Sequence, residues 1–117
     1  MEKIRLGLKG FGEIPRHIYR MCQEDERIEV VAISDLGRPE ILTYLVEAET
    51  KGRVKAKLEG NFIVSKNGKS RFIGGGEPGK IPWDMFDVDV IVDGTYGYSD
   101  PKAIWKNIFK QEPKGSF

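Results

Sequence analysis

The sequence is poor in the residues on which several kinds of fold and site depend. It holds one cysteine and one histidine in 117 residues, which excludes an internal disulfide framework and disfavours a zinc site built from this chain. No stretch approaches the roughly 18 uncharged apolar residues of a membrane-spanning helix. The 19 Lys and Arg residues nearly balance the 18 Asp and Glu residues, for a net charge of +1. We therefore expect neither nucleic acid nor a membrane as partner.

What is present suits one α/β domain. Hydrophobic residues make up 39% of the chain, enough for a modest core. The N-terminal MEKIRLGLKG enters a strand-like pattern without the features of a signal peptide, so we expect a cytoplasmic protein. We assign residues 1–110 to the domain and residues 111–117 to a short polar tail.

The first third of the chain has the pattern of a β-α-β unit. Residues 3–8 alternate polar and apolar side chains, and from Ile14 the apolar residues recur at helical spacing. Residues 28–34 form a β-branched run typical of a buried parallel strand. We expect Cys22, on the apolar stripe of the helix, to be a core residue. The opposite, polar face of this helix carries Arg16, Arg20, Gln23 and Glu24.

The remaining patterns complete the fold. We predict a second helix from Pro39 to about residue 51, a strand over 88–93 and a last helix over 101–110. Between the second helix and that strand, Asn67-Gly68 separates two apolar runs and predicts a hairpin. The whole predicts a Rossmann-like, doubly wound α/β fold, with a mostly parallel sheet and a small antiparallel hairpin insertion.

A glycine turn after the first strand carries the clearest chemical signal. Gly10-x-Gly12-x-x-Pro15 is a dinucleotide-binding fingerprint whose last glycine is replaced. Such glycines allow a tight turn and let backbone N–H groups approach a pyrophosphate at a helix N-terminus. Asp35 follows Gly12 by 23 positions, at the end of the second strand. A carboxylate there accepts hydrogen bonds from a ribose and repels a 2′-phosphate, which favours NAD over NADP.

Two residues favour the opposite interpretation, in which the turn only connects two elements. Pro15 replaces the glycine that brings helix and strand together, and it disfavours a helical conformation at Ile14. Glu13 places a negative charge beside the expected pyrophosphate, and Lys9 partly offsets it. A working site and a vestigial one both remain open.

Several segments resemble the glyceraldehyde-3-phosphate dehydrogenase family. KIRLGLKGFGEIPRHIYR is similar to its opening strand followed by G-x-N-G-F-G-R-I-G-R, and IEVVAISDL to its second strand with the ribose-binding Asp. IPWDMFDVDVIVDGTYGYS resembles its IPW and V-D-V-V-I-E-S-T-G segments. The resemblance covers residues 3–100 and implies NAD as cofactor. Fingerprint and resemblance together assign cofactor binding to Gly7, Gly10, Phe11, Gly12, Glu13, Ile14, Asp35, Thr95 and Tyr96.

The resemblance does not bring the family's catalytic residues with it. The family's catalytic cysteine, in S-C-T-T-N, and its catalytic histidine lie beyond the cofactor domain, and this sequence matches neither. His17 and Cys22 are five positions apart and do not share a helix face. We therefore assign no catalytic residue and no metal ligand. Tyr96 stands where the family has the glycine of S-T-G, so we expect adenosine binding through Asp35 to be favoured over correct nicotinamide placement.

The function that follows is binding of NAD or an adenine nucleotide, without independent dehydrogenase activity. One alternative is a non-binding structural or interaction domain derived from a truncated family member. Another is one half of a split dehydrogenase, whose second chain supplies catalysis. Trp105, Ile108 and Phe109 gather on the last predicted helix, and we expect such apolar surface to serve self-association, most simply as a homodimer.

Overall fold

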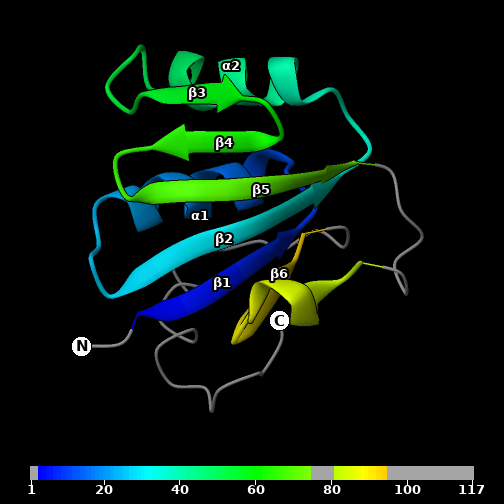
Figure 1. Ribbon diagram of the computed structural model, residues 1–117. Coiled ribbons are helices and arrows are strands. Elements are labelled where there is room, and N and C mark those ends of the chain that lie inside the picture. Colours follow the sequence, from blue (N-terminus) through cyan, green and yellow to red (C-terminus); the bar gives the residue numbers. More distant parts are fainter. Residues whose placement is uncertain (1–2, 75–80, 95–117) are drawn as a thin grey trace.

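The structure, a computed structural model, describes residues 3–74 and 81–94 as a mixed sheet flanked by helices (Figure 1). The sheet has six strands in the order β3-β4-β5-β2-β1-β6. The strands are β1 (Ile4–Lys9), β2 (Ile28–Asp35), β3 (Ala56–Glu59), β4 (Phe62–Ser65), β5 (Gly68–Gly74) and β6 (Val90–Asp93). The helices are α1 (Glu13–Gln23), α2 (Pro39–Ala48) and a short 3-10 helix, η2 (Trp83–Phe86). Helix α1 lies behind the sheet in Figure 1, and η2 lies in front of it.

Four strands, β5, β2, β1 and β6, are mutually parallel. Strand β6 joins β1 on the side away from β2, so the strand order reverses at β1. This is the arrangement of a doubly wound α/β sheet, and it confirms the predicted Rossmann-like fold. The reversal also marks the crevice in which such sheets bind ligands.

The predicted hairpin forms around Asn67 and Gly68, and Gly68 has a φ of +117° that favours glycine. Strand β5 pairs antiparallel with β4 on one side and parallel with β2 on the other. The Asn67 Nδ2 donates to the carbonyl oxygens of Cys22, Asp25 and Ile28 at 2.8, 3.0 and 2.8 Å. The insertion is therefore an extension of the main sheet, anchored where α1 ends and β2 begins.

The main core lies between the sheet and α1. Its largest fully buried side chains include Phe11 and Tyr19, whose rings meet edge to face at 5.5 Å. Cys22 is fully buried, as predicted, and burial raises the pKa of its thiol. On the other sheet face the ring of Trp83 lies against Gly7, where a Cβ would come within 2.8 Å of it.

One expectation about the first helix is wrong. We expected Pro15 to disfavour a helical Ile14, yet α1 begins at Glu13 and includes Ile14. Pro15 is the third residue of the helix, where an N–H would have no intrahelical acceptor, so its ring removes no hydrogen bond. The ladder starts one residue later, with Arg16 N donating to Gly12 O at 2.9 Å.

Several predictions fall outside the described residues. They are the last helix over 101–110 with its self-association surface, the tail over 111–117, and the cofactor contacts of Thr95 and Tyr96. The first strand ends at Lys9 rather than Leu8, and the last described strand begins at Val90 rather than Val88. None of the described helices has the length and apolar character needed to cross a membrane.

Candidate functional site

The carboxyl ends of β1, β2 and β6 meet at one edge of the sheet. They carry Lys9, Asp35 and Asp93, and Lys9 Nζ lies 3.3 Å from Asp93 Oδ2 across the β1/β6 pair. Ligands of open α/β sheets bind outside these carboxyl ends, where the strand order reverses. The predicted glycine loop leaves β1 at this same place.

The loop turns at Gly10 and opens into α1 at Gly12. Gly10 has a φ of +94°, and its N–H donates to Ser34 O at 2.6 Å, which holds the turn against β2. Gly12 is the N-cap residue of α1, and no described side chain caps the helix. A Cβ on Gly12 would meet no described atom within 4 Å. Among the described residues, none therefore fills the space beside Gly12 at the positive end of α1, where an anion-binding helix N-terminus holds its ligand.

Asp35 joins this loop directly. Its Oδ1 accepts a hydrogen bond from Phe11 N at 2.8 Å, and its Oδ2 accepts one from Gly37 N at 2.7 Å. Each carboxylate oxygen has a second lone pair, so the group can still accept hydrogen bonds from a ribose diol. The structure thus brings Gly10, Gly12 and Asp35 together as the sequence predicts.

The side chains of three further predicted residues, Gly7, Phe11 and Ile14, are absent or turned into the protein, so these residues can offer a ligand little besides backbone atoms. The Phe11 side chain is fully buried and its N–H is held by Asp35, while Ile14 is half-buried against the core. Gly7 is buried within β1 beneath Trp83, two residues before the strand ends. Their contacts with a cofactor stay predictions, and the role visible here is packing.

The charges around the N-terminus of α1 differ from the expectation that Lys9 offsets Glu13. Glu13 is exposed in the first turn of α1, and its charge helps to raise the pKa of Arg16, after the stronger effect of Glu49. Lys9, which we expected to offset Glu13, is ion-paired with Asp93. Glu13 therefore stays the negative group nearest the open end of α1 along the chain.

Pro15 has a partner that the sequence did not reveal. A Cβ on Gly94 would overlap Pro15 Cγ and lie 3.0 Å from Cδ, so the proline ring fills the space above Gly94. Gly94 N also donates to Lys9 O at 2.8 Å, which closes the end of β6 onto β1. The small residue needed for close packing of helix and strand thus stands at position 94 instead of position 15.

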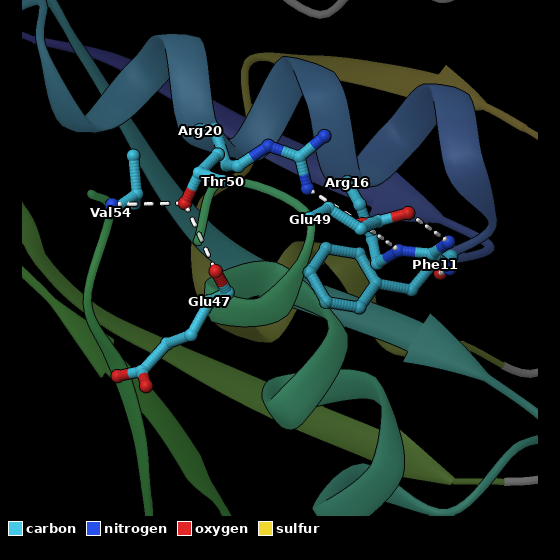
Figure 2. A network of polar contacts seen from close by, with 7 residues as sticks. All are labelled: Phe11, Arg16, Arg20, Glu47, Glu49, Thr50 and Val54. Atoms are coloured by element: carbon cyan, nitrogen blue, oxygen red, sulfur yellow. Dashed lines mark hydrogen bonds and ion pairs between the residues drawn. The ribbon is translucent and has the colours of Figure 1, made fainter. Parts of the chain in front are cut away.

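An arginine network behind the loop is a feature that the sequence did not predict (Figure 2). Arg16 is 9% exposed and donates to both carboxylate oxygens of Glu49, at 2.8 and 2.9 Å, and to Phe11 O at 2.9 Å. Arg20 donates to Glu49 Oε1 at 2.8 Å. These hydrogen bonds, led by those from Arg16, lower the pKa of Glu49 to about 2. Because Arg16 falls on the polar helix face, its spacing alone gives no sign of burial.

The described cavities lie away from the glycine loop. One of about 600 Å³ runs between the later turns of α1 and the segment after α2, and the exposed His17 is on its wall. A second of about 400 Å³ lies between the ends of the helices and the β3–β4 hairpin. In residues 3–74 and 81–94, no group of three or more His, Cys, Asp or Glu side chains is placed to hold a metal ion.

Comparison with known proteins finds relatives of this chain in one family. The family model described as glyceraldehyde 3-phosphate dehydrogenase, NAD binding domain, matches residues 4–100. A glyceraldehyde-3-phosphate dehydrogenase of Buchnera aphidicola is 33% identical over 114 residues, which are 95% of this chain and 34% of that protein. The cytosolic glyceraldehyde-3-phosphate dehydrogenase of Trypanosoma brucei brucei is 34% identical over 95 residues, or 79% of this chain and 29% of that protein. That of Salmonella typhimurium is 37% identical over 97 residues, with the same coverage. The chain spans about a third of the length of these relatives.

Proposed function

The chain belongs to the glyceraldehyde-3-phosphate dehydrogenase family through its NAD-binding domain, and we propose that it binds NAD where the glycine loop meets Asp35. The observation that carries the proposal is the joint placement of three groups. A helix N-terminus that no described side chain caps begins at Gly12, a carboxylate lies beside it at Asp35, and the Phe11 N–H links the two. A pyrophosphate suits the first group and an adenosine ribose suits the second.

The charge at Asp35 sets the choice between dinucleotides. Both of its oxygens are fixed by backbone N–H groups, so the carboxylate has no freedom to turn away from a 2′-phosphate. NADP would place like charges side by side at this point. We propose that NAD and ADP-ribose bind and that NADP binds much more weakly.

Glu13 shapes the other half of the site. Its carboxylate stands in the first turn of α1, where a negative charge opposes an incoming pyrophosphate. The adenosine end then contributes most of the affinity. We propose that ADP-ribose binds at least as tightly as NAD.

The described residues supply no independent dehydrogenase chemistry in this proposal. Cys22 is fully buried in the core with the pKa of its thiol raised, so it is a poor nucleophile. His17 is exposed on α1 and lines a separate cavity. Catalysis therefore requires residues beyond those described, whether from this polypeptide or from a partner chain or second copy. We further propose a cytoplasmic location, in keeping with the cytosolic relative.

Calorimetric titration with NAD, ADP-ribose and NADP tests the binding site. Gly12→Ala is the sharpest variant, because its methyl group would meet no atom of the described residues but would occupy the space that a pyrophosphate must approach. We expect Gly12→Ala to lower the affinity for NAD at least about tenfold. The unfolding midpoint should shift little, because the loss of a favourable N-cap glycine is offset by the lower conformational entropy of the unfolded chain. Asp35→Asn keeps the shape of the side chain and removes its charge. It should weaken the binding of ADP-ribose and reduce the difference in affinity between NAD and NADP. Absence of saturable binding by the unmodified chain would leave the non-binding interaction domain as the better description.

A further inference from the structure

Arg16 is a buried cation next to the proposed site, and the proposed function gives it no role. Its side chain is 11% exposed, and each of its three nitrogens donates to a described acceptor. Two of these bonds form a fork on Glu49, from the segment that follows α2, and the third reaches Phe11 O in the glycine loop. One guanidinium thus ties the loop to an element 33 residues away along the chain.

The bond to Phe11 O determines where the next N–H points. The described peptide bonds include no cis bond. In a planar trans peptide the carbonyl oxygen and the following N–H point in opposite directions. Since Arg16 holds the Phe11 carbonyl toward the protein, the Gly12 N–H is turned away from it. That N–H has no acceptor among the described residues.

Phe11 is held on its other sides as well. Asp35 Oδ1 accepts from its N–H, and its ring is packed edge to face on Tyr19 in the core. These two contacts fix the first half of the turn and leave the Phe11–Gly12 peptide free to rotate. The bond from Arg16 is the one described contact that fixes that peptide.

We propose that Arg16 is a positioning residue that aims the Gly12 N–H at the nucleotide, so that the loop is preorganised before the ligand arrives. The inference rests on the proposed function, because it names the group that prepares the same site. Preorganisation raises affinity by removing an ordering cost from binding. Arginine suits the role because its planar fork satisfies Glu49 with two donors and keeps a third for the carbonyl, which a lysine ammonium cannot do in one geometry.

Arg16→Lys tests the proposal, and Arg20→Lys is its matched control. Arg20 lies one turn later on α1 and donates to the same Glu49, but it does not contact Phe11 O. Arg16→Gln serves as a second variant, since it removes the charge and keeps a donor. Each variant of the full chain is titrated with ADP-ribose. Its thermal unfolding midpoint and the hydrogen exchange of the Phe11 amide, which donates to Asp35, are measured without ligand.

We expect the two Arg16 variants to weaken the binding of ADP-ribose about tenfold and to speed hydrogen exchange of the Phe11 amide. Arg20→Lys should lower the unfolding midpoint yet change affinity by less than about twofold. Equal losses of affinity in the Arg16 and Arg20 variants would overturn the proposal, because they would reflect stability alone. If the unmodified chain binds no nucleotide, the proposed function fails. Hydrogen exchange of the Phe11 amide then tests by itself whether Arg16 holds the loop. Faster exchange in the Arg16 variants then supports the loop-holding role, and unchanged exchange overturns it.

Discussion

Replacing Gly94 with alanine tests how α1 is seated on the end of β6. The added Cβ would overlap Pro15 Cγ and lie 3.0 Å from Cδ, closer than carbon atoms normally approach. Proline has no χ1 rotation with which to move its ring aside. The first turn of α1 and the end of β6 must therefore separate, at the edge of the sheet where the glycine loop opens.

The size of the effect follows from two opposing contributions. Overpacking of this kind costs about 1 to 3 kcal/mol, and the rigid ring places Gly94→Ala near the upper end. Alanine lowers the conformational entropy of the unfolded chain relative to glycine, and this stabilises the folded protein by about 0.4 to 1 kcal/mol. The φ of Gly94 is outside the positive range, so backbone strain adds nothing. We expect a net loss of about 2 kcal/mol in the free energy of unfolding, or about 8 °C in the unfolding midpoint.

A double-mutant cycle with Pro15→Gly identifies the cause. Urea unfolding of the two single variants and the double variant gives the free energies for the cycle. If the proline ring is the obstacle, Gly94→Ala costs less than about 0.5 kcal/mol in the Pro15→Gly background. A cost that is the same in both backgrounds, or a Gly94→Ala protein as stable as the parent, would refute the packing argument.

Two other predictions concern charges and hydrogen bonds away from the loop. Because the pKa of Glu49 is lowered from 4.5 to about 2, its ion pairs stabilise the protein above pH 4.5 and lose this effect as the pH falls toward 2. With allowance for solvent screening, Glu49→Gln should lower the free energy of unfolding by about 1 to 2 kcal/mol at pH 7 and hardly at all at pH 2. Urea unfolding at the two pH values measures this difference, and equal losses at both would contradict the argument. Asn67→Asp replaces a donor shared by three carbonyl oxygens with a negative acceptor and should cost about 3 kcal/mol in thermal unfolding. Asn61→Asp, at an exposed turn, is the control and should cost little.

The main elements of the fold could be predicted because their signals are local. Alternation over residues 3–8, helical spacing from Ile14 and a β-branched run over 28–34 each report the face that a segment buries. Asn67-Gly68 marked its turn because few residues adopt a positive φ. The joining of β5 to β2 was not predictable in this way. A strand's own pattern does not say which neighbour it pairs with.

The candidate site divides along the same line. From the sequence by itself, the spacing of the Gly10–Gly12 turn and Asp35 determined that these residues meet at the carboxyl ends of the strands, since chain order and strand length bring those positions together. Only the tertiary structure decided that Arg16, on the polar face of its helix, is buried against Glu49 and holds the Phe11 carbonyl. It likewise decided that Gly94 makes room for Pro15. The physical reason is that helical periodicity identifies the apolar face of a helix, whereas a polar side chain becomes buried only when a distant segment supplies its partner.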